Sequence, residues 1–154
     1  MNGNQNTEEK VLYDKILGLR NREGRAINHM GVKITDLAPG WAKGEIKMEE
    51  YHLNPIGSIH GGVLFFLADS VAGSAAFTRG NAVTTSNGFI HFLNPAIGVE
   101  TLIAEASELK AGKNLLTYDV TIRTEKNKII SKATMEYYNL RVPVDEIDEK
   151  LGEN

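Results

Sequence analysis

The sequence predicts an α+β fold in which a curved antiparallel sheet of about six strands wraps around one long helix. Residues 63–79 are nearly all apolar or small and contain no proline, which favours a largely buried helix over a strand of that length. Segments on both sides of this helix alternate apolar and polar residues, as half-buried strands do. One helix cannot cover both faces of such a sheet, so we expect the sheet to curve around it and self-association to cover its edge.

The N-terminal third contains the first helix and the first two strands. Residues 1–8 are polar and predict a disordered tail, and residues 11–19 carry apolar side chains at helical spacing. A strand is predicted at 28–37. After the Pro39-Gly40 turn, residues 42–49 alternate cleanly and predict a second strand. Residues 51–62 are rich in glycine and Asn-Pro, which indicates an ordered loop before the long helix.

Four more strands are predicted after Gly80-Asn81 ends the helix, at 83–93, 99–110, 115–124 and 129–140. Short turns rich in Asn, Gly and Lys join the last three, which indicates a meander. Pro143 is expected to end the sheet. The sequence therefore predicts a single domain over 9–142 and a C-terminal tail over 143–154 that is either a short helix or disordered.

Composition excludes several classes of function. The 154 residues include 17 basic and 20 acidic side chains, a formal net charge of -3, so no basic nucleic-acid surface is expected, although a local patch could bind a phosphorylated ligand. The chain has no cysteine, which removes disulfide scaffolds, thiolate zinc sites and cysteine nucleophiles. His29, His52 and His91 show no metal-ligand spacing, so no metal site is expected. Without a secretory segment or a membrane span, a cytoplasmic location is predicted.

Asp69 is the one charged residue between Gly62 and Arg79, inside the apolar helix. Burying a carboxylate there is costly unless it is paired or hydrogen-bonded. Two interpretations stay open at this point. Either Asp69 lies on an exposed stripe or binds strand backbone, or it is a desolvated acid in a cleft, suited to act as a base or a nucleophile.

The His60-Gly61-Gly62 segment stands at the start of the same helix. The unpaired N–H groups of a helix N-terminus can bind an anion or stabilise a developing oxyanion, although a Gly-Gly pair can also simply form a tight turn. His60 is a candidate general base or metal ligand, or a residue that fixes the loop. Gly61 and Asp69 are about 12 Å apart along the helix, so they could serve one substrate only if they came from two subunits, as in a symmetric dimer, or if the substrate spanned the gap.

The residues from Asn54 to Asp69, with His60-Gly61-Gly62 among them, resemble the motif of hotdog-fold acyl-CoA thioesterases of the PaaI-like, phenylacetate-degradation type. The resemblance continues at 92–96 and 110–113 and covers about residues 30–140. It implies the hotdog fold and hydrolysis of an acyl-CoA substrate between the subunits of a dimer or a dimer of dimers. No separate cofactor is implied, because coenzyme A is part of the substrate.

The same resemblance implies roles for individual residues. The Gly61 N–H would polarise the thioester carbonyl, and Asp69 of the opposing subunit would act as base or nucleophile. Asn54 would position water or the carbonyl, His60 would support the loop, and Thr85 would orient water. Substrate contacts are expected from Gly62, from Phe65 and Phe89 in the acyl pocket, and from Lys110, Lys113 and Lys132 at the phosphates of coenzyme A. Each of these aromatic and basic residues could instead be plain core or solvated surface.

Two other functions fit the same fold. One is a non-catalytic acyl-CoA sensor or binding module, which would need neither Asp69 nor Asn54. The other is an enoyl-thioester hydratase, which usually presents an acid and a histidine in another arrangement. The sequence contains no motif for a serine hydrolase, a P-loop NTPase or a dinucleotide-binding enzyme.

Overall fold

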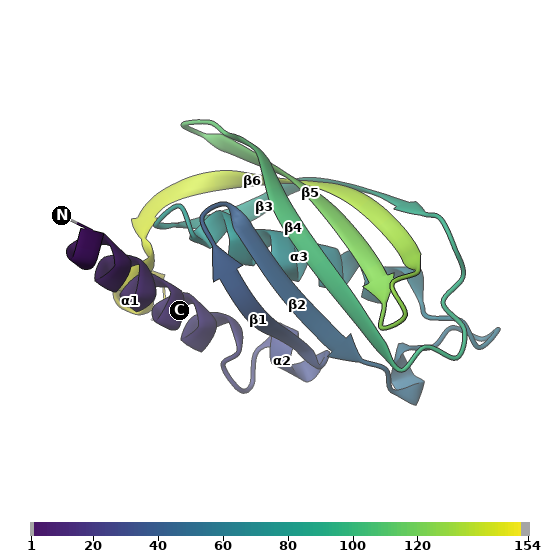
Figure 1. Cartoon of the computed structure of the whole chain (residues 1–154). Coiled ribbons are helices and arrows are strands. Elements are labelled where there is room, and N and C mark those ends of the chain that lie inside the picture. Colours follow the sequence, from purple (N-terminus) through teal and green to yellow (C-terminus); the bar gives the residue numbers. More distant parts are fainter. Residues whose placement is uncertain (1, 152–154) are drawn as a thin grey trace.

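One antiparallel sheet curves around helix α3 (Gly61–Phe77) in the computed structural model, which describes residues 2–151 and the side chains of 6–150 (Figure 1). Within this range the sheet has six strands in the order β1-β2-β4-β5-β6-β3. Their bounds are β1 Val32–Ala38, β2 Trp41–Lys47, β3 Asn81–Phe92, β4 Thr101–Ala111, β5 Leu115–Thr124 and β6 Ile129–Pro143. The predicted α+β class is therefore confirmed.

Helix α3 is buried along most of its length because its small residues let the strands approach closely. Leu67, Ala68 and Val71 are fully buried. A methyl group added at Gly44 of β2 would lie 2.8 Å from Val71 Cγ2 and 3.0 Å from the Lys33 carbonyl oxygen. Helix and sheet therefore meet at backbone distance here, and the burial of each large aliphatic side chain stabilises the fold by roughly 1.5–3 kcal/mol.

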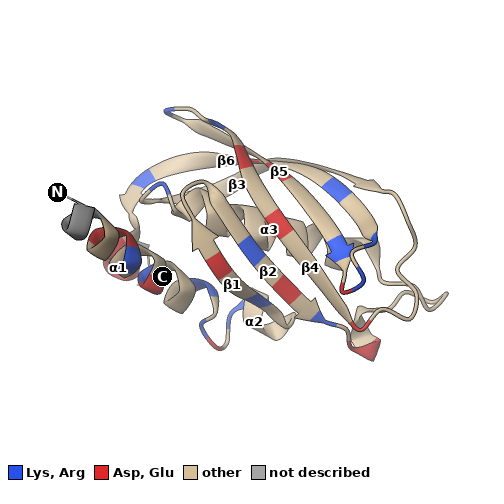
Figure 2. Cartoon of the chain, in the orientation of Figure 1, with Lys and Arg blue, Asp and Glu red and all other residues tan. Residues whose placement is uncertain are grey.

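The strands alternate between the two faces of the sheet, as their sequences predict. In β5, Leu116, Tyr118, Val120 and Ile122 are buried against α3, while the intervening side chains are only partly covered. Figure 2 shows charged residues spread over β1, β2, β4 and β5 in the view onto the other face. The inner face thus forms the core with α3, and the outer face meets solvent in the single chain.

The N-terminal helix is longer than the residues 11–19 predicted for it, and the predicted start of the first strand was wrong. Helix α1 (Asn2–Arg20) begins at Asn2, within the predicted disordered tail, and helix α2 (Ala26–His29) occupies the predicted start of the first strand. Ile16 is fully buried against Phe77 and Val144, which anchors α1. Once a helix is anchored, extending it by further residues is much easier than starting it, even through polar sequence. Met1 lies outside the described residues.

The C-terminal segment folds back onto α1 through a 3-10 turn, η2 (Val144–Glu146), and helix α4 (Ile147–Leu151). Asp148 accepts hydrogen bonds from Arg22 at 3.0 Å and from Lys15 at 3.2 Å. Figure 1 shows the yellow segment after β6 beside α1. Of the two tail conformations expected from the sequence, the described part adopts the short helix; residues 152–154 lie outside the described residues. None of the described helices has the length and apolarity that a membrane crossing requires.

Strand β3 forms the edge of the sheet nearest to the candidate site. It pairs with β6 on one side only, and its residues 84–87 are exposed. The register shifts between Thr85 and Asn87, where β3 has one residue more than β6. A bulge of this kind reverses the alternation of side chains beyond it. Thr85 therefore faces α3 with Tyr137, whereas Phe89 faces outward with Thr134.

Candidate active site

The loop before α3 is held in shape by its own polar side chains. A 3-10 turn, η1 (Glu50–His52), begins it. Asn54 Oδ1 then accepts the backbone N–H groups of Ile56 at 3.1 Å and Ser58 at 3.0 Å. Buried His52 braces the same region, because its Nδ1 accepts the Glu49 N–H and its Nε2 lies 3.0 Å from the Met30 carbonyl oxygen. The oxygen of Asn54 is thus committed to the loop.

His60 caps the N-terminus of α3. Its Nδ1 accepts the Gly62 N–H at 2.9 Å, which agrees with a loop-supporting role and engages the Gly62 donor. Gly61 is the first helical residue, so its N–H has no acceptor within the helix. No described residue accepts this N–H either. One free donor at the positive end of α3 therefore remains at Gly61.

Asp69 lies on the side of α3 that faces β3 and β6. The Thr85 hydroxyl donates to Asp69 Oδ1 at 2.7 Å. The Tyr137 hydroxyl also donates to Asp69 and lies 2.9 Å from Oδ1 and 2.8 Å from the backbone oxygen. Asp69 is partly buried, so it is not a fully solvated surface acid, and the described donors to its carboxylate are side-chain hydroxyls rather than strand backbone.

Two residues that the sequence did not single out complete the surroundings of Asp69. Burial, followed by the nearby charge of Asp69, raises the pKa of Tyr137 well above its ordinary value. Arg20, at the end of α1, donates to the Ser70 carbonyl oxygen at 2.7 Å and to Ser74 Oγ at 2.9 Å. Burial lowers the pKa of Arg20, and Tyr137 and Asp69 oppose that shift. The guanidinium also stacks over Phe77, 5.4 Å from the ring centroid.

Cavities adjoin both ends of the candidate site. Asp69 lines one of about 440 Å³, bounded by the end of α1, α3 and the C-terminal segment, and another of about 160 Å³ shared with Thr85 and Tyr137. Arg20 lines both. A third cavity, of about 300 Å³, lies at Gly61 beside Phe92 and Leu93. Gly61 and Asp69 of one chain therefore line different cavities.

The two residues predicted for the acyl pocket, Phe65 and Phe89, do not lie together within one chain. Phe65 lies on α3 between Gly61 and Asp69, at four-residue spacing from each, and a Cβ added at Gly88 of β3 would come within 2.7 Å of its ring. Phe89 is 60% exposed on the outer face, edge-on to His91. Within one chain Phe89 therefore does not join Asp69, because the β3 bulge turns it to the opposite face from Thr85.

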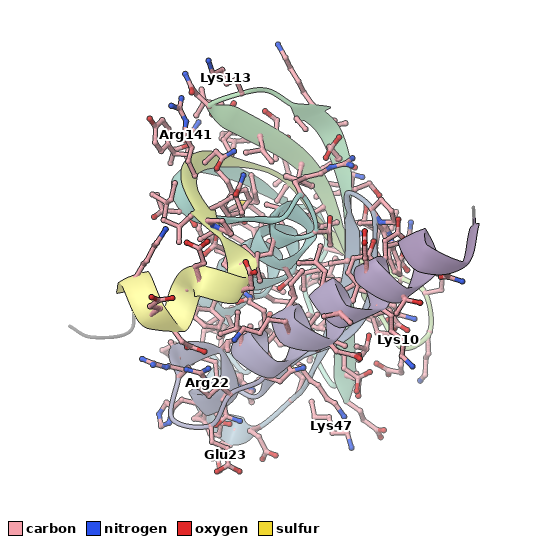
Figure 3. The ribbon with its side chains drawn as sticks, turned by 90° about the vertical axis from the view of Figure 1, so that its left-hand side faces the viewer. Lys10, Arg22, Glu23, Lys47, Lys113 and Arg141 are labelled. Carbon is pink, nitrogen blue, oxygen red and sulfur yellow. The ribbon has the colours of Figure 1, made fainter. Side chains whose placement is uncertain are left out.

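The predicted basic residues also differ in their surroundings. Lys132 donates to Asp119 and to Thr121, each at 2.7 Å, so its charge is already paired. Lys110 and Lys113 are exposed at the end of the β4–β5 hairpin and form no ion pair with a described side chain. Figure 3 shows Lys113 at the same end of the molecule as Arg141, which donates to Asn114 at 2.5 Å. Of the three predicted lysines, Lys110 and Lys113 therefore have a charge that no described acidic side chain pairs.

The sheet wrapped around a central helix defines a hotdog domain, here with an acid on the helix and a glycine at its N-terminus. The sequence model of the thioesterase superfamily matches residues 56–131. A putative esterase of Archaeoglobus fulgidus is 30% identical over 133 residues, which are 86% of each protein. The acyl-coenzyme A thioesterase PaaI of Escherichia coli is 32% identical over 102 residues, 66% of this chain and 73% of that protein.

Solved structures agree with the sequence comparisons. The structure of the E. coli PaaI protein from the phenylacetic acid degradation operon has a TM-score of 0.77 and 27% identity, and the match covers 86% of this chain and 98% of that one. A mutant of the phenylacetic acid degradation protein PaaI from Thermus thermophilus has a TM-score of 0.70 at 29% identity over 74% of this chain and 97% of that one. The chain belongs to the thioesterase superfamily and resembles its PaaI members.

Proposed function

We propose that this chain hydrolyses acyl-CoA thioesters to a free acid and coenzyme A, at a site shared between two copies of the chain. The observation that supports this most is the presence on one helix of a free N–H donor, at Gly61, and a carboxylate held by two hydroxyls, at Asp69. The E. coli relative that is named an acyl-coenzyme A thioesterase supports the substrate class.

The proposed chemistry follows from these two groups. The Gly61 N–H and the positive end of α3 stabilise the negative charge that develops on the carbonyl oxygen when the thioester is attacked. Asp69 takes a proton from water as that water attacks the carbonyl carbon. Alternatively, Asp69 attacks the carbon itself and forms an anhydride that water then opens. In both routes the C–S bond breaks, and the sulfur leaves as the coenzyme A thiol after protonation.

A second copy is needed because of the length of α3. Gly61 and Asp69 are eight residues apart, about 12 Å along the helix axis. Each must approach the reacting carbonyl or its attacking water to about 3 Å, so one chain cannot place both on the same thioester. A two-fold partner added along the open edge at β3 would face Asp69 of one copy toward Gly61 of the other. The exposed Phe92 and Leu93 beside Gly61 would be covered there.

Mixing two inactive variants tests the shared site. Gly61→Pro lacks the N–H and Asp69→Asn lacks the base, so each is expected to be inactive alone. After equal amounts of the two are unfolded together and refolded, half of the dimers contain one chain of each kind. In such a dimer, Gly61 of one chain meets Asp69 of the other at one of the two sites. About one quarter of the wild-type activity is therefore expected. Because the chain has no cysteine, a thiol-reactive dye counts only released coenzyme A. No recovery on mixing would refute a shared site.

A panel of aromatic, short-chain and long-chain acyl-CoAs tests the reaction itself. Tight binding without thiol release would indicate a binding module instead. Hydration of a crotonyl thioester would indicate a hydratase, although neither cavity that Asp69 lines contains a histidine among the described residues. Incorporation of labelled oxygen from water into Asp69 during a single turnover would distinguish nucleophile from base, because only the anhydride route exchanges a carboxylate oxygen.

The unpaired lysines of the β4–β5 hairpin are the better candidates for the phosphates of coenzyme A. The double variant Lys110→Gln/Lys113→Gln is expected to raise KM for an acyl-CoA but not for the matching pantetheine thioester, which lacks the nucleotide phosphates. Lys132→Gln is expected to change KM less, since Asp119 already binds that ammonium group. Equal effects on both thioesters would rule out a role in phosphate binding.

A further inference from the structure

We infer that Tyr137 is a positioning residue of the proposed reaction. Together with Thr85 it fixes Oδ1 of the Asp69 carboxylate and leaves Oδ2 as the oxygen that acts on water or on the thioester. This inference rests on the proposed hydrolase function and adds to it which oxygen reacts and what holds that oxygen in place.

Both hydrogen bonds to the Asp69 carboxylate end on the same oxygen. Thr85 approaches Oδ1 to 2.7 Å and Tyr137 to 2.9 Å, whereas Oδ2 receives no donor from any described residue. A carboxylate oxygen has two lone pairs, so two donors occupy Oδ1. The lone pairs of Oδ2 remain available to accept a proton or to attack carbon.

The two donors also restrict rotation of the carboxyl group. They come from adjacent strands, since Thr85 and Tyr137 are direct partners in the β3–β6 register. Tyr137 additionally lies 2.8 Å from the backbone oxygen of Asp69, which ties the side chain to its own helix. The terminal torsion of an aspartate is otherwise broad, and a reacting group must be held to within about 0.5 Å.

Tyrosine suits this position because its ring is rigidly packed and keeps its proton. The Tyr137 ring is buried and stands edge-on to Tyr118, with centroids 6.1 Å apart. Burial and the charge of Asp69 raise the pKa of the Tyr137 phenol well above its ordinary value, so it remains a donor at neutral pH. Gly73 of α3 leaves room for the ring, since a Cβ there would already touch it at 3.4 Å.

Replacing each tyrosine of this pair by phenylalanine isolates the hydroxyl at Asp69. Tyr137→Phe removes the donor and keeps the ring. Tyr118→Phe makes the same change at a buried tyrosine whose hydroxyl donates to Glu108 at 3.2 Å. A hydrogen bond to a charged group corresponds to about a 10- to 100-fold effect, so Tyr137→Phe is expected to lower kcat by that factor at unchanged KM. Tyr118→Phe is expected to lower the melting temperature by about as much as Tyr137→Phe does, while its kcat stays at the wild-type value.

The Thr85 variants test the second donor in the same way. Thr85→Val removes the hydroxyl at nearly constant shape and is expected to lower kcat, and Thr85→Ser is expected to restore most of that loss. The double variant Tyr137→Phe/Thr85→Val should lose about as much kcat as the two single variants combined, or more. A kcat for Tyr137→Phe equal to that of Tyr118→Phe, with Asp69→Asn inactive, overturns the inference and leaves the proposed function intact.

A crystal structure of the double variant gives a readout that does not need turnover. With both donors gone, the Asp69 carboxylate is expected to leave its wild-type orientation. If the wild-type chain hydrolyses no thioester, the proposed function fails, and this structure still decides the positioning role. An unchanged carboxylate orientation in the double variant overturns it.

Discussion

Replacing Gly61 by proline removes the proposed oxyanion donor with little change to the fold. Proline has no N–H, and the first helical position favours it. His60, the residue before it, already has φ -64 and ψ 134, which a residue preceding proline adopts readily. The nearest heavy atom to a Cβ at Gly61 is Cζ of Phe92, at 3.1 Å, so any substitution at Gly61 must shift this ring by a few tenths of an ångström. Loss of one such donor lowers kcat by about 10²–10³-fold.

Gly61→Ala is the matched control, because it adds the same Cβ beside Phe92 but keeps the N–H. Initial rates of thiol release at saturating acyl-CoA, measured beside the melting temperature of each variant, separate loss of the donor from loss of fold. We expect Gly61→Ala to retain most of the wild-type kcat and Gly61→Pro to melt at or above the wild-type temperature. The reasoning is refuted if the two variants have similar kcat values, whether both are active or both inactive.

Two further predictions concern stability. Gly44→Ala should lower the free energy of unfolding in urea by about 1–3 kcal/mol, because its Cβ would lie 2.8 Å from Val71. Gly18→Ala in α1 has open space around it and should raise the free energy of unfolding by about 0.5–1 kcal/mol. Hydrogen bonding from Arg79 to Glu108, at 2.6 Å, lowers the pKa of Glu108 from its ordinary 4.5. The resulting stabilisation is complete above about pH 4.5 and disappears as the pH falls through the lowered pKa, so the difference in melting temperature between wild type and Glu108→Gln should shrink in acid.

Much of the fold could be predicted from the sequence because the relevant patterns are local. The apolar run from Val63 fixes the helix, and the alternation in β5 fixes which face meets it. Helix α1 is longer than predicted because distant partners of Ile16 hold it, and no pattern within residues 2–8 reports those partners. The bulge in β3 could not be predicted either, because it depends on how β3 pairs with β6. It turns Phe89 to the face of the sheet opposite Thr85 and thus away from Asp69.

The candidate site was predicted where its residues are close in sequence. Gly61, His60 and Asp69 lie within one loop and helix, so their spacing could raise a donor and an acid as candidates, and the family resemblance implied roles for both. Thr85, which the resemblance implied would orient water, donates a hydrogen bond to Asp69. Tyr137 was missed because it is 68 residues away and reads as an ordinary inward residue of a strand. The positions that build the surroundings of an acid come from tertiary packing, which a single sequence does not encode locally.

Substitution of Gly73 would change the surroundings of Asp69 without replacing a residue that the proposed substrate would contact. A methyl group there would lie 3.3 Å from the Arg20 guanidinium, which would have to move by a few tenths of an ångström, and 3.4 Å from the Tyr137 ring, which it would touch. Asp69 would keep its place on the helix while the Arg20 guanidinium moved and the Tyr137 ring became more tightly packed. Gly73, which has no Cβ, therefore leaves the space that Arg20 and Tyr137 occupy. Graded enlargement of residue 73 is expected to change the proposed reactivity of Asp69 without any direct contact to the carboxylate.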